Sequence, residues 1–352
     1  MPELKEVFEM VTKQSEPDLD SWREQEQRQR STARNRRIGA FALVAAIGVV
    51  AIVIAINTIG GDTKRTAGPP GPIPEASTHV LFDVDTGSTR PLPWPLEGGF
   101  TYAVSPDGDE LVFAPWDPIG DDNHNHVYIA DVGGTAVRRV TPEPAAMDEF
   151  NPRWSPGGQI VFQGRNRLTE EVGNLYLLDP ITGSTTKLTS LPPLSSHHWF
   201  MSASVRPDGQ VILFNLPRGQ LEDQVWDLWT IGSAGGEPQL ARRDAAHGSY
   251  SPDGTKIAYL GRPRYEGDTF AGTSIWLADA DGSDPRLLVM APGEREELRW
   301  PRWSPDGTRI AYADQGGGVY VVDVITHRIS RVVDGGRPEW LDDDTLIIDS
   351  DV

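Results

Sequence analysis

Short apolar runs alternate with turn residues along most of the chain, from about residue 79 to the C-terminus. The runs are rich in β-branched and aromatic residues, and none is spaced like a long amphipathic helix, so the pattern predicts strands. One unit recurs at intervals of about 45–53 residues, as AVSPDGDELVFA (103–114), PRWSPGGQIVFQ (152–163), SVRPDGQVILFN (204–215), GSYSPDGTKIAYL (248–260) and PRWSPDGTRIAYAD (301–314). A repeat of this length built from short strands is typical of a β-propeller.

Each copy of the unit has the same internal order. A large or β-branched residue precedes the turn and is predicted to pack between neighbouring sheets; these residues are Val104, Trp154, Val205, Tyr250 and Trp303. Pro-Asp-Gly then reverses the chain, because proline fixes φ, aspartate bonds its own backbone and glycine accepts a positive φ. A return strand, a third strand such as NLYLLD (174–179) and a fourth such as TTKLTS (185–190) complete one four-stranded blade.

Five complete repeats fill roughly residues 99–334 and leave two fragments. Residues 79–93 match a third and fourth strand, and residues 337–352 match a first and second strand, with Trp340 in the position of Trp303. Pairing of 79–93 with 337–352 would build a sixth blade from both ends and remove the open sheet edges. The predicted fold class is therefore all-β, a six-bladed β-propeller with four-stranded blades over residues 78–352.

The Ser/Arg-Pro-Asp-Gly turn followed by a strand resembles the WD40-like PD40 repeat of TolB-type six-bladed propellers, over about 275 residues. Two turns depart from this pattern. Gly157 stands in place of the aspartate, and LDDD (341–344) replaces Ser-Pro-Asp-Gly in the last repeat. Both departures concern turn geometry, so the resemblance still implies the propeller fold.

The same repeat occurs in the propellers of prolyl-oligopeptidase-like proteases, so an enzyme has to be considered. Such a hydrolase needs an α/β domain with a Gly-x-Ser-x-Gly nucleophile turn, and the sequence shows neither. DDNHNHVY (121–128) and LADADGSDP (277–285) carry possible metal ligands, but polar loops and turns explain both runs better. We predict no catalytic residue, no metal site and no cofactor.

An uncharged apolar run of 23 residues, IGAFALVAAIGVVAIVIAINTIG (38–60), precedes the repeats. About 20 such residues span a bilayer as a helix. A cleaved signal peptide is the rival interpretation, but its apolar region is usually shorter and follows a short basic start, whereas 37 residues precede this run. Five arginines between residues 28 and 37 favour a cytoplasmic N-terminus. We therefore predict one N-terminal transmembrane α-helix, a cell-membrane location and an extracytoplasmic propeller.

The segments on either side of the apolar run differ in character. Residues 61–77 are rich in Gly and Pro, which predicts an extended linker. In the basic and amphipathic tail (1–37), Leu4, Phe8 and Val11 would form one apolar stripe of a short helix. That helix could lie on the membrane surface, stay solvated, or bind a cytoplasmic protein through residues 4–30.

The net charge and the absence of cysteine exclude further functions and kinds of chemistry. The formal charge of −19 argues against nucleic-acid binding, because phosphate contacts need clustered Lys and Arg on the folded domain. Without cysteine, neither disulfides nor thiol chemistry contribute.

The inner strand of each predicted blade runs along the propeller axis, so the residues just ahead of the repeated turn line the funnel. Alignment on the turn defines two rings. The first ring is Thr101, Asn151, Ser202, His247, Trp300 and Arg337, and the second is Ala103, Arg153, Ser204, Ser249, Arg302 and Glu339. The candidate ligand-binding residues are Asn151, Arg153, His197, His198, Trp199, His247, Trp300, Arg302, Arg337 and Glu339.

Arginine and tryptophan in these rings suit an acidic or polar ligand, because arginine offers paired hydrogen bonds and tryptophan a flat apolar face. The alternative is that Arg153 and Arg302 only pair with acids between blades, such as Asp148 or Glu149. The sequence thus predicts a non-catalytic, single-pass bacterial membrane protein that binds a protein, peptide or cell-envelope ligand. A signalling protein whose tail contacts a regulator such as a sigma factor is the alternative, and a hydrolase is the least favoured class.

Overall fold

The computed structural model describes residues 79–92, 100–115, 125–133, 136–141, 147–166, 171–191, 202–219, 225–261, 264–266, 269–271, 273–291 and 296–349. All of them belong to one compact unit, Glu75–Val352, and a second unit, Met1–Pro74, lies outside them. The predicted tail, transmembrane helix (38–60) and most of the linker fall in that second unit. Within the described ranges, no helix has the length and apolar character needed to cross a membrane.

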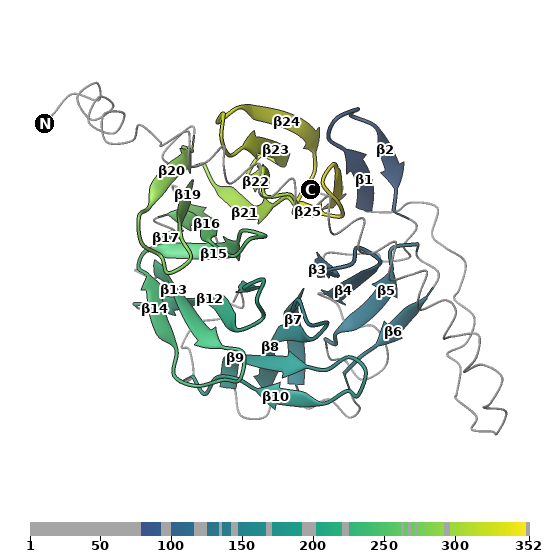
Figure 1. The fold of residues 1–352 in the computed structure, drawn as a ribbon, viewed down its shortest axis with the longest axis vertical. Helices are drawn as coiled ribbons and strands as arrows, with labels where there is room; N and C mark the ends of the chain where they lie inside the picture. The colour runs from purple at the N-terminus through teal and green to yellow at the C-terminus, as the bar shows by residue number, and fades with distance from the viewer. Residues whose placement is uncertain are drawn as a thin grey trace, which may run out of the picture. The chain divides into compact units, whose positions relative to one another are not determined.

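The described residues form antiparallel sheets arranged as the six blades of a ring (Figure 1). Blade 1 contains β3 (Phe100–Val104), β4 (Glu110–Pro115), β5 (Tyr128–Asp131) and β6 (Val137–Arg139), and blade 2 contains β7 (Met147–Trp154), β8 (Ile160–Asn166), β9 (Glu171–Leu178) and β10 (Thr185–Lys187). Blade 3 contains β11 (Ala203–Val205), β12 (Val211–Arg218), β13 (Val225–Gly232) and β14 (Gln239–Arg242). Blade 4 contains β15 (Ala245–Tyr250), β16 (Lys256–Gly261), β19 (Ser274–Asp279) and β20 (Arg286–Val289), and blade 5 contains β21 (Leu298–Trp303), β22 (Arg309–Asp314), β23 (Gly318–Asp323) and β24 (Ile329–Asp334). The prediction of an all-β propeller with six four-stranded blades is confirmed.

A closing blade joins the two ends of the described chain. Its strands are β2 (Thr89–Pro91), β1 (His79–Asp83), β26 (Thr345–Asp349) and β25 (Glu339–Trp340), in this spatial order. β1 runs antiparallel to β26 over its whole length, from His79 opposite Asp349 to Asp83 opposite Thr345. Each half of the sheet therefore supplies the hydrogen-bonding edge that the other half needs.

Blade 3 has an addition that the sequence pattern did not predict. β17 (Arg264–Glu266) and β18 (Thr269–Ala271) form a hairpin between β16 and β19 of blade 4 in chain order. β17 nevertheless pairs with β13 of blade 3, where Arg264 lies opposite Val225. The hairpin thus extends the neighbouring sheet, a contact between distant residues that local alternation cannot reveal.

The repeated turn is stabilised by contacts within a few residues. In blade 5 the Ser304 hydroxyl donates a hydrogen bond to Asp306 Oδ1 at 2.6 Å and accepts one from the Arg309 backbone N–H at 3.0 Å. Gly307 completes the reversal with a φ of 72°. Because all of these contacts are local, the Ser-Pro-Asp-Gly motif makes the same turn contacts in blades 1, 4 and 5.

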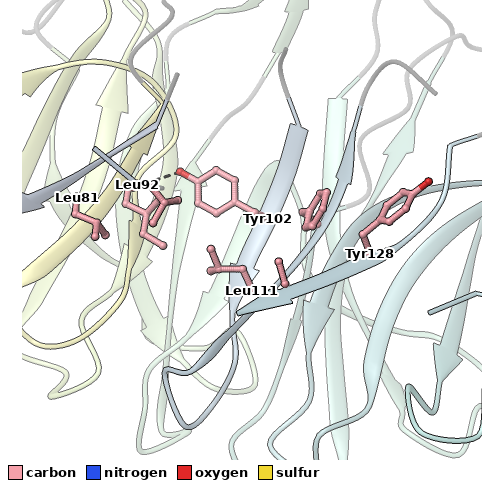
Figure 2. Close-up of a cluster of buried hydrophobic side chains, with 8 residues drawn as sticks. Leu81, Leu92, Tyr102, Leu111 and Tyr128 are labelled. Carbon is pink, nitrogen blue, oxygen red and sulfur yellow. Dashed lines mark hydrogen bonds between the residues drawn. The ribbon is translucent and has the colours of Figure 1, made fainter. Parts of the chain in front are cut away.

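Buried side chains pack between neighbouring blades. Leu81 and Ile347 of the closing blade belong to one such cluster with Tyr102 and Leu111 of blade 1. Figure 2 shows Leu81, Tyr102 and Leu111 of this cluster. The Tyr102 hydroxyl donates to the backbone carbonyl of Arg337 at 2.7 Å, and the carbonyl of Ile347 lies 3.3 Å away. One tyrosine therefore joins the first complete blade to the C-terminal part of the chain.

A buried carboxyl group lies between blades 1 and 2. Glu149 is 3% exposed and accepts a hydrogen bond from the Val127 backbone N–H at 2.8 Å. Burial raises the pKa of Glu149 to about 7. The neighbouring Asp148 accepts a hydrogen bond from the Asn125 backbone N–H at 3.3 Å. These two acids therefore hold the segment that leads into β5.

Candidate functional site

The inner strands carry most of the predicted site residues. Figure 1 shows β3, β7, β15, β21 and β25 on the centre-facing side of their blades. On these strands lie Asn151, Arg153, His247, Trp300, Arg302 and Glu339, and Arg337 lies just before β25. His197, His198 and Trp199 lie outside the described residues. Among the residues that the structure describes, no group of three or more metal-ligating side chains is placed to hold an ion.

Three inner strands contain a β-bulge at the first predicted ring. The strand register shifts within residues 150–153 of β7, 246–249 of β15 and 299–302 of β21. The bulged residues have positive φ angles of 51° at Asn151, 52° at His247 and 52° at Trp300. Such angles are uncommon outside glycine, and a bulge re-aims the side chains that follow it. The regular alternation of side chains is therefore interrupted in these three strands, between the two rings that alignment on the turn predicted.

Two guanidinium groups share one carboxylate at the second predicted ring. Arg153 Nη1 lies 3.0 Å from Glu339 Oε2, and Arg302 Nε lies 3.1 Å from the same oxygen. The three side chains, from blade 2, blade 5 and the closing blade, are 14%, 9% and 15% exposed. Both arginines thus pair with an acid from another blade. The suggested partners Asp148 and Glu149 were wrong, because those acids bind backbone N–H groups near β5.

Two backbone carbonyls hold the arginines in place. Arg153 Nη1 donates to the Tyr102 carbonyl of blade 1 at 2.7 Å. Arg302 Nη1 donates to the carbonyl of Pro301 at 3.1 Å. The guanidinium of Arg153 therefore reaches past blade 1 to the closing blade.

Trp300 is packed against two more arginines. The guanidinium carbon of Arg337 lies 4.8 Å from the centre of the Trp300 ring, and that of Arg299 lies 5.8 Å from it. Both distances fit cation–π contacts. Arg299 also pairs with the buried Glu297, whose Oε2 lies 2.9 Å from Arg299 Nε. We name the set Tyr102, Arg153, His247, Arg299, Trp300, Arg302, Arg337 and Glu339 the axial cluster.

The electrostatics of the axial cluster reflect crowded positive charge. Burial, followed by the charge of Arg153, lowers the pKa of Arg302 to about 9 and that of Arg337 to about 10. Burial and the nearby guanidiniums of Arg302 and Arg337 lower the pKa of His247 to about 3. At neutral pH the arginines are therefore charged and the imidazole is neutral.

Sequence reasoning missed Tyr102 and Arg299, because Tyr102 falls between the two ring positions of its strand and Arg299 directly precedes the first ring position of β21. A stronger signal is present in the chain. The order Pro-Arg/Glu-Trp occurs in three inner strands, at 152–154, 301–303 and 338–340. Its middle residues are Arg153, Arg302 and Glu339, the three side chains that meet. Proline lacks an N–H, which suits a bulge, and the motif thus marks the interacting blades.

Comparison with known proteins shows that the six-bladed propeller is similar in fold to TolB. No family model matches the chain. A solved TolB structure from Agrobacterium tumefaciens superposes with a TM-score of 0.60 at 18% identity, covering 77% of this chain and 96% of that one. TolB from Acinetobacter baumannii superposes with a TM-score of 0.52 at 16% identity, covering 78% and 63%. At these identities the structural likeness concerns the fold.

Sequence relatives include two kinds of protein. The Tol-Pal system protein TolB of Bordetella avium is 28% identical in an alignment of 218 residues that covers 56% of this chain and 44% of that protein. A tricorn protease homologue of Streptomyces coelicolor is 26% identical in an alignment of 307 residues that covers 75% of this chain and 23% of that protein. The chain thus spans less than half the length of either relative, and one of the two bears the name of a protease.

Proposed function

We propose that this chain is a non-catalytic binding protein that presents its TolB-like propeller to a protein, peptide or cell-envelope ligand. The axial cluster is the observation that carries the proposal, because it gathers Arg299 and Arg337 around Trp300 and Arg153 and Arg302 around Glu339. Guanidiniums bind acidic and polar groups through directional hydrogen bonds without any chemical step. The TolB relatives agree with such a role.

The state of His247 favours binding over hydrolysis. A general base works best when its pKa lies near the operating pH. The pKa of His247 is lowered to about 3, mainly by burial and then by the surrounding arginines. This imidazole is therefore a weak base, and the cluster is better suited to hold a ligand than to activate a nucleophile.

The substitution Trp300→Asn tests the proposal. Asparagine tolerates positive φ, and Asn151 already occupies the equivalent bulge of blade 2 at 51°, so the backbone of β21 is retained. Only the ring that Arg337 and Arg299 pack against is lost. The full-length chain would capture ligands from an envelope extract, with mass spectrometry to identify them. We expect the variant to bind the captured ligand about tenfold more weakly or worse, because central aromatic residues dominate binding energy.

Arg286→Ala serves as the control for Trp300→Asn. Arg286 lies on β20 and pairs with Asp284 at 2.8 Å on the exposed outer part of blade 4. Binding should survive in this control, and the melting temperature of both variants should stay near that of the wild type. Equal capture by Trp300→Asn and wild type would rule out ligand binding at the axial cluster.

We further propose that residues 38–60 anchor the protein in the cell membrane with the propeller outside. The apolar run and the five arginines before it support this orientation. Protease added to spheroplasts should degrade the propeller and spare a tag placed before Met1. Degradation of the tag with an intact propeller would reverse the topology. Contact of residues 4–30 with a cytoplasmic regulator stays a prediction.

A further inference from the structure

The two arginines that share Glu339 have unused hydrogen-bonding capacity. Each contacts the carboxylate through a single nitrogen, Nη1 of Arg153 and Nε of Arg302, and both contacts fall on Oε2. Within the described part of the chain, Nη2 of either arginine has no acceptor, yet neither atom is among the nitrogens cut off from solvent. A guanidinium binds a carboxylate best through two parallel N–H groups. The free N–H groups are thus placed to receive a second carboxylate.

The arginines around this pair also outnumber the carboxylates that face them. The described cationic groups of the cluster are Arg153, Arg299, Arg302 and Arg337, and the carboxylates that face them are Glu297, Glu339 and Asp349. Glu297 is engaged by Arg299, so Glu339 alone bridges Arg153 and Arg302. The lowered pKa of Arg302 and Arg337 follows from burial and from this mutual repulsion. One additional negative charge would relieve the repulsion.

We propose that Arg153 and Arg302 bind a carboxylate of an acidic peptide, and that Glu339 competes with that carboxylate for the same N–H groups. The inference rests on the proposed binding function and names the chemistry of its ligand. An acidic peptide fits better than an anionic sugar, because guanidiniums already lie over the Trp300 ring on which a sugar would stack. Glu339 thus occupies N–H groups that the carboxylate of the peptide would use, and it lowers the affinity of the site for that peptide.

Competition predicts substitutions with opposite effects. Glu339→Gln removes the competing charge and keeps the shape of the side chain. Arg153→Gln removes one binding group and leaves the Arg302–Glu339 pair at 3.1 Å intact. The probes are the peptide N-acetyl-Gly-Glu-Gly-amide, its Gln counterpart and glucuronate, titrated calorimetrically into the full-length chain in detergent micelles.

The wild type should prefer the Glu peptide to the Gln peptide about tenfold, because hydrogen bonds to charged groups are the stronger class. Glu339→Gln should bind the Glu peptide about tenfold more tightly than the wild type, and Arg153→Gln about tenfold more weakly. Arg206→Gln is the control, since Arg206 pairs with Asp208 at 2.7 Å on the turn of blade 3, and it should bind as the wild type does.

Several outcomes would overturn the proposal. Equal binding of the Glu and Gln peptides would exclude a carboxylate site. A lower melting temperature of Glu339→Gln without any gain in affinity would assign Glu339 a purely structural role. Tighter binding of glucuronate than of the Glu peptide would replace the peptide with a sugar. If Glu339→Gln does not fold, Arg153→Gln still decides, because unchanged affinity in that variant contradicts the proposal.

The proposed function is tested separately. Loss of the captured envelope ligand in Trp300→Asn, together with equal binding of the Glu and Gln peptides, would retain the binding function and reject the carboxylate site. If the protein prefers the Glu peptide but captures no envelope ligand, the carboxylate site is retained and the proposed binding of an envelope ligand is rejected.

Discussion

A chain that ends at Gly336 is expected to lose the cooperative fold of the propeller. The truncation removes β25 and β26, and with them the buried side chains of Trp340, Leu346, Ile347 and Ile348. β1 and β2 would remain as an isolated hairpin, which is marginal in water, and blades 1 and 5 would each lose a packing partner. Urea unfolding followed by circular dichroism should show a broad transition, or none, in place of a single cooperative one.

A chain that ends at Asp349 is the matched control. It keeps every residue of β25 and β26, so its unfolding midpoint should equal that of the full-length protein. A truncation at Gly336 that unfolds with the same midpoint and slope as this control would contradict the role of the closing blade.

The substitution Glu149→Gln is expected to stabilise the propeller above neutral pH by about 3 kcal/mol, the free-energy equivalent of the pKa difference at this site. Burial raises the pKa of the carboxyl group from 4.5 to about 7, so charging it costs more in the folded than in the unfolded chain. The glutamine carbonyl can still accept the hydrogen bond from the Val127 N–H. The gain comes from removing a buried charge.

The protonation of Glu149 determines how its contribution to the stability of the propeller changes with pH. Between pH 4.5 and about 7 the folded state binds more protons at Glu149 than the unfolded state does. The contribution of this group to stability therefore falls as the pH rises through that window and is constant above it. Urea unfolding at pH 5 and pH 8 should show a difference between the two pH values that shrinks in Glu149→Gln.

Glu237→Gln controls for the loss of one negative charge, because Glu237 lies on an exposed turn of blade 3. Identical free energies of unfolding for Glu149→Gln and wild type at pH 8 would show that Glu149 carries no such penalty.

The closing blade could be predicted from the sequence because its strands repeat the residue pattern of the other blades. Trp340 was matched to Trp303 from the pattern of apolar residues. In the structure both indoles donate to a backbone carbonyl of the preceding blade, Trp303 to Ser249 at 3.1 Å and Trp340 to Arg302 at 3.0 Å. Equivalent positions in the repeat thus make equivalent contacts, even where LDDD replaces the usual turn.

The pairing of Arg153 and Arg302 with Glu339 could not be predicted from the sequence pattern. Arg153 and Glu339 are separated by 186 residues and meet only because blade 2 and the closing blade both face the axis. Asp148 and Glu149 are nearer in sequence, but the bulge between Phe150 and Arg153 re-aims the chain, and backbone N–H groups engage the two acids. Proximity in sequence therefore pointed to the wrong carboxylates.

The sequence by itself determined the turns, the number of blades and the pairing of the two ends, because these depend on contacts within a few residues or on a period repeated along the chain. Only the tertiary structure decided which side chains meet at the axis. Three bulges with positive φ depend on the pairing of adjacent strands, and the hairpin between β16 and β19 depends on the packing of blade 4 beside blade 3. The carboxylate shared by two arginines depends on closing the ring. Ring closure sets distances between residues that no local pattern relates, so the chemistry of the axial cluster is a property of the closed propeller.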